Sequence, residues 1–137
     1  MPKRGALKIE TFFAESRVFG LFRDYQRLEE EVVRSLREQR LSFRQALLLV
    51  AIYVEKDGVG PGALVAAFRL PKSQISEGIS ALESRGFVRR CLDESDGRRI
   101  RLELTARGRA FGAPLMSLFE VFERDLDANF RANVRLK

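Results

Sequence analysis

The sequence contains no histidine, no tryptophan and only one cysteine, Cys91, among its 137 residues. Without histidine the chain lacks the usual general base and the commonest metal ligand, so a Ser-His-Asp triad is excluded. A single cysteine excludes an internal disulfide and a cysteine-based zinc site. The carboxylates of Asp93 and Asp96 fall in a polar turn, where nothing would desolvate them for acid–base work. We therefore expect a binding protein with no enzymatic activity, no metal and no cofactor.

Long apolar runs are also missing. The longest spans residues 46–54 and is much shorter than the roughly 18–20 residues that cross a membrane. The basic start, Met-Pro-Lys-Arg-Gly, is followed by charged residues that interrupt any signal-peptide-like apolar region: Lys8, Glu10, Glu15 and Arg17. We therefore expect a cytoplasmic protein without a membrane partner.

Positive charge is in excess, with 25 Lys and Arg against 19 Asp and Glu, a formal net charge of +6. Such a balance is compatible with a polyanionic partner, although it is also ordinary for a soluble protein. The excess is unevenly distributed, because residues 68–110 hold ten basic and six acidic side chains, a surplus of +4. The rest of the chain supplies only +2, so a polyanion is expected to bind within 68–110.

Apolar residues at steps of three and four predict a mainly α-helical (α+β) chain that forms one structural domain. Residues 10–39 are expected to form one long amphipathic helix. Ser42, followed three residues later by Gln45, is a capping-box pattern. It predicts a second helix that extends to about residue 56.

A short third helix is predicted over 62–68, because Gly60 suits the N-cap position and Pro61 the first helical position. A fourth helix covers 72–85, and Gly86 supplies its stop. The apolar face of this fourth helix consists of Ile75, Ile79 and Leu82.

Two strands are predicted next, over 87–92 and 99–104, joined by a polar hairpin tip at 93–98. Thr105 can cap a last long helix that reaches toward residue 134. Pro114 lies about two turns inside this helix, where it should either kink the helix or mark its true start.

Phenylalanine is concentrated in the two terminal helices: eight of the 11 Phe lie within 12–22 and 111–130. A pair of helices alone would leave much of that surface in water. A second copy related by a two-fold axis is the simplest partner that would cover it.

The predicted order of a helix, a short helix, a three-residue turn, a helix and a hairpin is that of a winged helix-turn-helix. Four strings between residues 41 and 108 carry a resemblance to the MarR family, bacterial regulators that bind DNA as dimers. They are Leu41-Ser42-x-x-Gln45, Ser73-Gln74-Ile75-Ser76, Leu82-Glu83-x-x-Gly86-Phe87-Val88-x-Arg90 and Asp96-x-Arg98-x-x-x-Leu102-x-Leu104-Thr105-x-x-Gly108.

The resemblance implies an N-terminal dimerisation arm at 1–40, a winged helix-turn-helix lobe at 41–108 and a C-terminal dimerisation helix at 109–137. It further implies a homodimeric transcriptional regulator, most often a repressor. Such a dimer places two recognition helices about 34–36 Å apart on double-stranded DNA, so the operator should be pseudo-palindromic.

The fourth helix is the expected recognition helix. Its polar residues away from the apolar face are Lys72, Ser73, Gln74, Ser76, Glu77 and Ser80. Glutamine can make a bidentate contact to adenine, serine can bond to bases or phosphates, and lysine suits phosphate. Gly78 is expected to weaken this helix by up to about 1 kcal/mol relative to alanine.

Glu77 conflicts with this interpretation, because many relatives carry a basic residue there and phosphates repel a carboxylate unless it accepts a bond from cytosine. It leaves open an alternative: a winged-helix module for protein–protein contact, with weak or lost DNA binding.

In the wing, Arg98 and Arg99 are the expected minor-groove and phosphate contacts. By resemblance, Asp96 would hold Arg98 in position through a charge-assisted bond. Arg101, with Arg89 and Arg90, could add backbone contacts from the strands. Cys91 lies on the first strand beside Arg89 and Arg90, and a redox-sensing thiol there is an alternative. A plain half-buried strand cysteine is the favoured interpretation.

Relatives of this type often bind small anionic or phenolic effectors between the arms and the lobe. By that resemblance a cleft would be lined by Phe19, Phe22, Tyr25 and Tyr53, together with Arg17 or Arg23. Aromatic residues at helical spacing are, however, more often part of the core.

Overall fold

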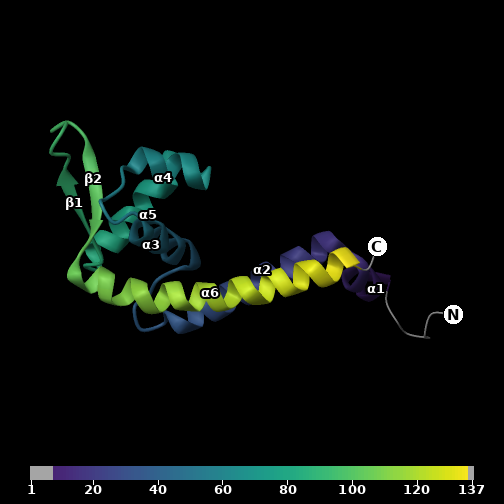
Figure 1. Ribbon diagram of the computed structural model, residues 1–137. Coiled ribbons are helices and arrows are strands. Elements are labelled where there is room, and N and C mark those ends of the chain that lie inside the picture. Colours follow the sequence, from purple (N-terminus) through teal and green to yellow (C-terminus); the bar gives the residue numbers. More distant parts are fainter. Residues whose placement is uncertain (1–7, 136–137) are drawn as a thin grey trace.

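The computed structural model describes the backbone of residues 8–135 and the side chains of residues 8–126. A compact lobe at one end holds α3 (Phe43–Val54), α4 (Pro61–Phe68), α5 (Lys72–Ser84) and the hairpin of β1 (Val88–Leu92) and β2 (Ile100–Leu104). An elongated arm consists of α1 (Lys8–Glu15), α2 (Arg17–Ser35) and α6 (Ala106–Arg135). Figure 1 shows α6 leaving the foot of the hairpin and running along α2 toward α1. The mainly helical winged helix-turn-helix prediction is confirmed.

The predicted single N-terminal helix over 10–39 is wrong, because the structure has two helices that meet at Ser16. The Ser16 hydroxyl accepts a hydrogen bond from the Phe19 N–H at 3.3 Å and so caps α2. A serine side chain that bonds to the following turn competes with helix continuation. The second helix then ends at Ser35, and Arg40 adopts a left-handed φ of 56° in the turn that leads to α3.

The start of α3 confirms the capping box. The Ser42 hydroxyl accepts from the Gln45 N–H at 3.1 Å, and the Gln45 side-chain oxygen accepts from the Ser42 N–H at 3.1 Å. The start of α4 is also as predicted, with Gly60 at the N-cap and Pro61 in the first turn.

The hairpin is antiparallel, with Val88 opposite Leu104 and Leu92 opposite Ile100. A further bridge was not predicted. Val59, in the loop before α4, exchanges two backbone hydrogen bonds with Leu102, of 2.8 and 3.1 Å. This bridge ties the second strand to the helix-turn-helix, so the base of the wing has a fixed position relative to α4 and α5.

The last helix starts where Thr105 caps it: its hydroxyl accepts from the Gly108 N–H at 3.0 Å and donates to the Gly86 carbonyl at 2.5 Å. Because the helix begins at Ala106, Pro114 lies inside it and does not mark its start. Gly108 is needed where it stands, since a Cβ there would lie 2.1 Å from the Phe87 carbonyl oxygen.

The hydrophobic core lies between the helices and strands of the lobe and extends into the adjoining part of the arm. It is entirely apolar among the described residues: Val32, Leu36, Leu41, Phe43, Ala46, Leu48, Leu49, Ile52, Leu64, Ile75, Ile79, Leu82, Phe87, Val88, Leu102, Leu104 and Leu115. Val32 and Leu36 bring α2 into the same cluster as the lobe helices. Within the part of the chain that the structure describes, no helix is both long and apolar enough to cross a membrane.

Candidate nucleic-acid interface

The recognition-helix candidate, α5, has two distinct faces. Ile75, Ile79 and Leu82 are buried, as predicted. The polar residues named from the sequence are exposed, except Gln74, which is half-buried: Lys72, Ser73, Ser76, Glu77 and Ser80. The helix therefore presents a row of short polar side chains to solvent, with one acidic residue in it.

Gly78 allows this helix to lie close to α3. A Cβ at Gly78 would come 2.3 Å from Leu48 Cδ1, and both residues are buried. The loss of helix propensity expected from the sequence is therefore accompanied by closer packing of α5 against α3.

Arg44 is a neighbour of α5 that the sequence interpretation missed. Its Nη1 donates a 2.7 Å hydrogen bond to Gln74 Oε1. Arg44 is exposed in the first turn of α3, thirty positions before Gln74. Only the packing of α5 against α3 brings these two helix starts together, so no local pattern signals the contact.

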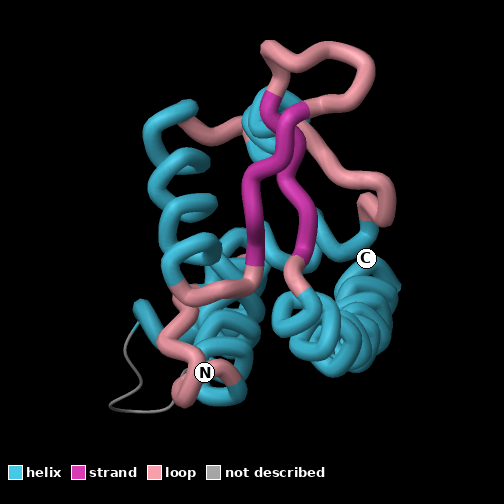
Figure 2. Tube along the Cα trace, turned by 90° about the vertical axis from the view of Figure 1, so that its left-hand side faces the viewer, coloured by secondary structure: helices cyan, strands magenta, loops and turns pink. Residues whose placement is uncertain are grey.

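The wing tip projects beyond the helices of the lobe, as Figure 2 shows. Asp96 organises it: one carboxylate oxygen accepts from the Arg98 backbone N–H at 3.1 Å, and the other lies 3.5 Å from Arg99 Nε. Asp96 thus holds the backbone of Arg98, while its side-chain ion pair is with Arg99. Among the described residues the Arg98 side chain forms no ion pair or hydrogen bond, and it is exposed.

The hairpin strands hold a second cluster of charge around Glu103. Its carboxylate accepts from Arg101 at 2.8 and 3.1 Å and from Arg89 at 3.3 Å. Burial raises the pKa of Glu103, but the hydrogen bonds, led by those from Arg101, outweigh it and lower the pKa below its ordinary value. Arg90 pairs with Glu83 at 3.2 Å. All three strand arginines are thus already paired with carboxylates.

Cys91 belongs to the same cluster. It is half-buried, and its Sγ donates to Glu103 Oε2 at 3.5 Å. That contact uses the proton of the thiol. The surroundings of Cys91 are therefore not made up of the two adjacent arginines alone, as the sequence suggested.

None of the three cavities described below is lined by all of the residues predicted for the effector cleft, which are Phe19, Phe22, Tyr25 and Tyr53. Phe19 packs against the rings of α1, at centroid distances of 5.1 and 4.2 Å, and Phe22 is exposed on the arm. Tyr53 lines a separate cavity of about 360 Å³ beside α6 and β2. The predicted residues share helical spacing, but they contact different elements.

Tyr25 alone of these lines a groove of about 570 Å³ between α2 and the lobe. Its ring contacts that of Phe43 edge-to-face at 5.6 Å. Partial burial and the neighbouring Glu29 carboxylate raise the pKa of the Tyr25 phenol. The remaining wall is Ser42, Arg44, Gln45, Leu47, Phe68, Leu70, Gln74, Glu77 and Gly78. The groove thus extends from α2 of the arm to Gln74, Glu77 and Gly78 on α5.

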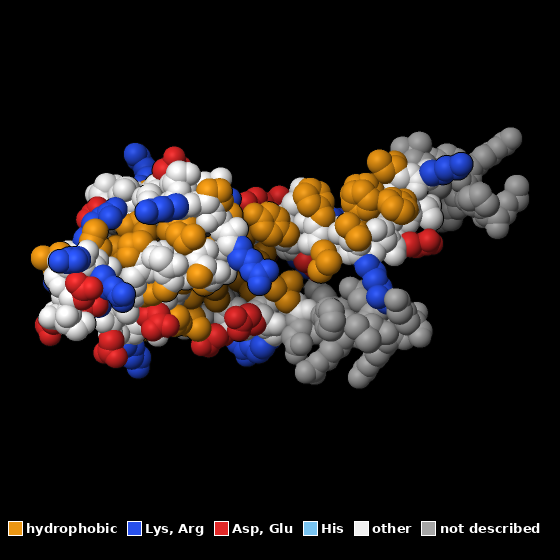
Figure 3. Space-filling model, turned by 90° about the horizontal axis from the view of Figure 1, so that it is seen from above, with side chains coloured by type: hydrophobic (Ala, Val, Ile, Leu, Met, Phe, Trp, Pro, Cys, Tyr) orange, Lys and Arg blue, Asp and Glu red, His pale blue; other side chains and the backbone are white. Residues whose placement is uncertain are grey.

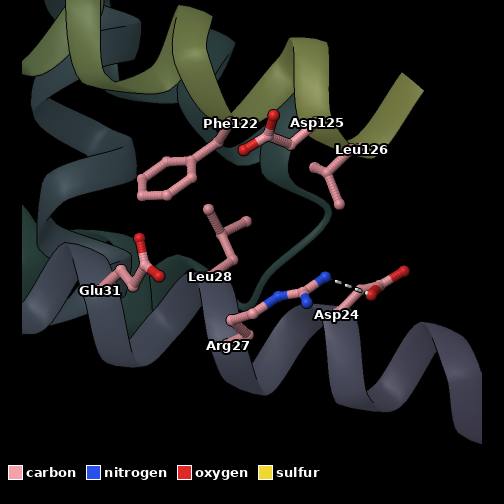
Figure 4. Close-up of a pocket in the computed structure, with 7 residues that line it drawn as sticks. All are labelled: Asp24, Arg27, Leu28, Glu31, Phe122, Asp125 and Leu126. Atoms are coloured by element: carbon pink, nitrogen blue, oxygen red, sulfur yellow. Dashed lines mark hydrogen bonds and ion pairs between the residues drawn. The ribbon is translucent and has the colours of Figure 1, made fainter. Parts of the chain in front are cut away.

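A further cavity, of about 410 Å³, lies inside the arm between α2 and α6 (Figure 4). Leu28, Phe122 and Leu126 form its apolar wall. Its charged groups are Asp24, Arg27, Glu31 and Asp125, and Arg27 is paired with Asp24 at 2.9 Å. With three carboxylates to one guanidinium, this cavity has the wrong charge for an anionic effector.

The arm carries large exposed apolar side chains, which gather on the face shown in Figure 3. Val18 and Leu21 are 74% and 66% exposed. The others on α1 and α2 are Ile9, Phe12, Phe22, Tyr25 and Val33. Large exposed apolar side chains gathered on one arm are typical of a surface that another molecule covers.

The sequence and the structure were both compared with those of known proteins. Residues 41–99 match the sequence model of the MarR family. The structure resembles the DNA complex of MepR from S. aureus, with a TM-score of 0.72 and 19% identity over 88% of this chain and 93% of that one.

It also resembles SlyA, with a TM-score of 0.72 and 16% identity over 88% of this chain and 92% of that one, and MarR itself. For MarR the TM-score is 0.66, with 23% identity over 95% of this chain and 82% of that one. The curated proteins include no match to the sequence. Residues 41–99 are therefore similar to the MarR family, and the chain has the winged helix fold of these solved structures.

Proposed function

We propose that this protein is a sequence-specific DNA-binding transcriptional regulator that acts in the cytoplasm as a repressor. The observation that carries the proposal is the combination of an exposed polar face on α5 with the unpaired Arg98 at the wing tip. A helix of this kind fits the major groove, and an arginine at the wing fits the narrow minor groove beside it. The structural neighbour MepR has been solved with DNA, which supports the same role here. No enzymatic activity is proposed.

Binding to DNA from upstream of the protein's own coding region tests this function. Fluorescence anisotropy is expected to show selective binding that weakens steeply with salt, as counterion release requires. Arg98→Ala should weaken binding severely without changing the oligomeric state. Arg37→Ala is the matched control, because Arg37 is exposed in the turn after α2, outside the lobe. Binding that is weak and equal on all sequences at physiological salt would overturn the proposal.

The functional unit we propose is a homodimer formed through the arm. The exposed residues Val18, Leu21 and Phe22 supply an apolar face that a two-fold copy would cover. Such a dimer reads a pseudo-palindrome with half-sites about one helical turn apart. Sedimentation equilibrium is expected to give twice the chain mass, and Leu21→Asp should shift the protein toward the monomer. A wild-type monomer at micromolar concentration would contradict the dimer.

An effector of anionic or phenolic type fits the groove beside α5 better than it fits the acidic cavity of the arm. Tyr25, Phe43 and Phe68 provide aromatic contacts, and Arg44 provides the cation. The groove holds two carboxylates, Glu29 and Glu77, where the arm cavity holds three. Benzoate, as a small aromatic anion, is expected to bind by calorimetry and to weaken DNA binding. Failure of benzoate and phenol to bind would remove this part of the proposal.

A protein–protein interaction module remains the second candidate, because Glu77 is exposed on the outward face of α5. Its carboxylate would be repelled by DNA phosphates if it met no base amino group. Glu77→Lys separates the two functions. If this change turns weak binding on all sequences into strong binding, Glu77 opposes DNA binding and the module is favoured. If it reduces selective binding, Glu77 makes a favourable contact.

A further inference from the structure

The bond between Arg44 and Gln74 fixes the orientation of the Gln74 amide. Arg44 Nη1 lies 2.7 Å from Gln74 Oε1. A guanidinium has only donors, so the amide atom that faces it must be the oxygen. The bond uses one of the two lone pairs of the oxygen and turns the amide nitrogen, with its two hydrogens, away from Arg44 toward any further partner.

This orientation conflicts with the usual pairing of glutamine and adenine. That pairing needs both ends of the amide: the oxygen accepts from the adenine N6 amino group, while the nitrogen donates to N7. When the amide oxygen of Gln74 is turned to Arg44, the amide NH2 group of Gln74 faces the N6 amino group of adenine. Both groups are donors, so no hydrogen bond forms between them. Guanine offers two adjacent acceptors instead, N7 and O6. We propose that Arg44 is a positioning residue that makes Gln74 select guanine over adenine, an inference that rests on the DNA-binding function proposed above.

Glu77 fits the same base pair. It lies three residues after Gln74, so the two side chains are neighbours along one side of α5, and both border the groove that Arg44 lines. A carboxylate only accepts hydrogen bonds, and the major-groove donor of a G·C pair is the cytosine N4 amino group beside guanine O6. A donor at Gln74 followed by an acceptor at Glu77 matches the order of acceptors and donor on that pair. The acidic residue then contributes to specificity and does not oppose binding.

Arg44 has a second conceivable role, as a plain phosphate contact. Removing a phosphate contact weakens binding to every sequence equally, whereas removing a positioning residue changes the preferred base. The base preference therefore separates the two roles, and a loss of affinity alone does not.

The experiment starts with selection of the bound sequence by wild-type protein from a random duplex DNA library. Affinity is then measured for the selected duplex, for the duplex with the G·C pair opposite α5 replaced by A·T, and for random DNA. Wild-type protein is expected to prefer G·C by about fivefold or more, the lower end of discrimination by a good base contact.

Arg44→Met removes the guanidinium from an exposed site while keeping a long side chain, so folding should be unaffected and thermal unfolding checks this. The freed amide can turn and pair with adenine, so the preference for G·C should fall clearly below that of the wild type or reverse toward A·T. Gln74→Met should lower the preference to the part that Glu77 supplies, and to the same value with or without Arg44. Lys72→Met is the matched control, which removes a cation from the same end of α5 and should lower both affinities by the same factor.

An Arg44→Met variant that binds both duplexes more weakly but keeps the wild-type preference would overturn the inference, as would a wild-type preference for A·T. If the wild-type protein binds the selected duplex no more tightly than random DNA, the proposed regulatory function fails as well. The comparison with random DNA keeps these two failures distinct.

Discussion

Replacing Gly78 by alanine should destabilise the protein although alanine is the best helix former. In an unhindered helix interior this change gains about 1 kcal/mol. At Gly78 the new Cβ would lie 2.3 Å from Leu48 Cδ1, whereas carbon atoms pack at about 3.5–4.0 Å. Leu48 is completely buried and has no solvent to move into. The contact must therefore open by more than about 1 Å, by moving either α5 away from α3 or Leu48 out of its rotamer.

Overpacking of this kind costs about 1–3 kcal/mol. After subtraction of the propensity gain of about 1 kcal/mol, the free energy of unfolding should fall by up to about 2 kcal/mol. Leu48→Val removes the clashing Cδ1. Combined with Gly78→Ala it should destabilise by less than the sum of the two single changes, with a coupling of about 1 kcal/mol.

Urea unfolding at one fixed protein concentration measures these differences, because the stability of an oligomer depends on concentration. Gly20→Ala is the matched control: Gly20 lies inside α2, and a Cβ there would have no atom within 4 Å. It should gain up to about 1 kcal/mol. If Gly78→Ala gains as much as Gly20→Ala, or if the effects of Gly78→Ala and Leu48→Val simply add, the packing argument is refuted.

Two further predictions concern the base of the wing. Thr105→Val removes the bonds to the Gly86 carbonyl and from the Gly108 N–H, and should cost about 1–2 kcal/mol in urea unfolding; unchanged stability would show that the cap contributes nothing. For Glu103, burial raises the pKa, but hydrogen bonds, led by those from Arg101, bring it below the ordinary 4.5. The folded state therefore favours the carboxylate, whose stabilisation is present above pH 4.5 and is lost as the pH falls below it. Thermal unfolding should show a steeper loss on acidification for the wild type than for Glu103→Gln, and identical acid dependence would contradict this.

The local features of the fold could be predicted because their signals lie within four residues of each other. Ser42 and Gln45 cap each other across one turn, and Gly60 with Pro61 fixes the start of α4 through backbone preferences alone. The break at Ser16, by contrast, was not predicted. Apolar residues keep helical spacing on both sides of it, and periodicity cannot distinguish one helix from two that share a face.

The features that were missed are contacts between residues distant in the sequence. Val59 meets Leu102 and Arg44 meets Gln74 only after the helices have packed, and neither contact leaves a pattern in the sequence. The predicted effector residues are placed on different elements for the opposite reason. Spacing grouped Phe19 with Tyr25 along one stretch of helix, yet the first packs on α1 and the second faces the lobe.

The charge distribution has to be reconsidered in the same way. The sequence places a surplus of +4 within residues 68–110. In the folded chain, however, the strand arginines Arg89, Arg90 and Arg101 are paired with carboxylates. Among the described residues of that window, the basic side chains outside these ion pairs include Arg98 at the wing tip and Lys72 at the start of α5, together with Arg69, Arg85, Arg107 and Arg109. Arg44, which borders α5, lies outside the window. A count along the sequence overestimates the positive charge that the strands of the wing offer and overlooks Arg44 on α3, because ion pairing depends on neighbours in space and not along the chain. The salt dependence of DNA binding should accordingly respond to Arg98→Ala and Lys72→Met, and only slightly to changes at Arg89 or Arg90.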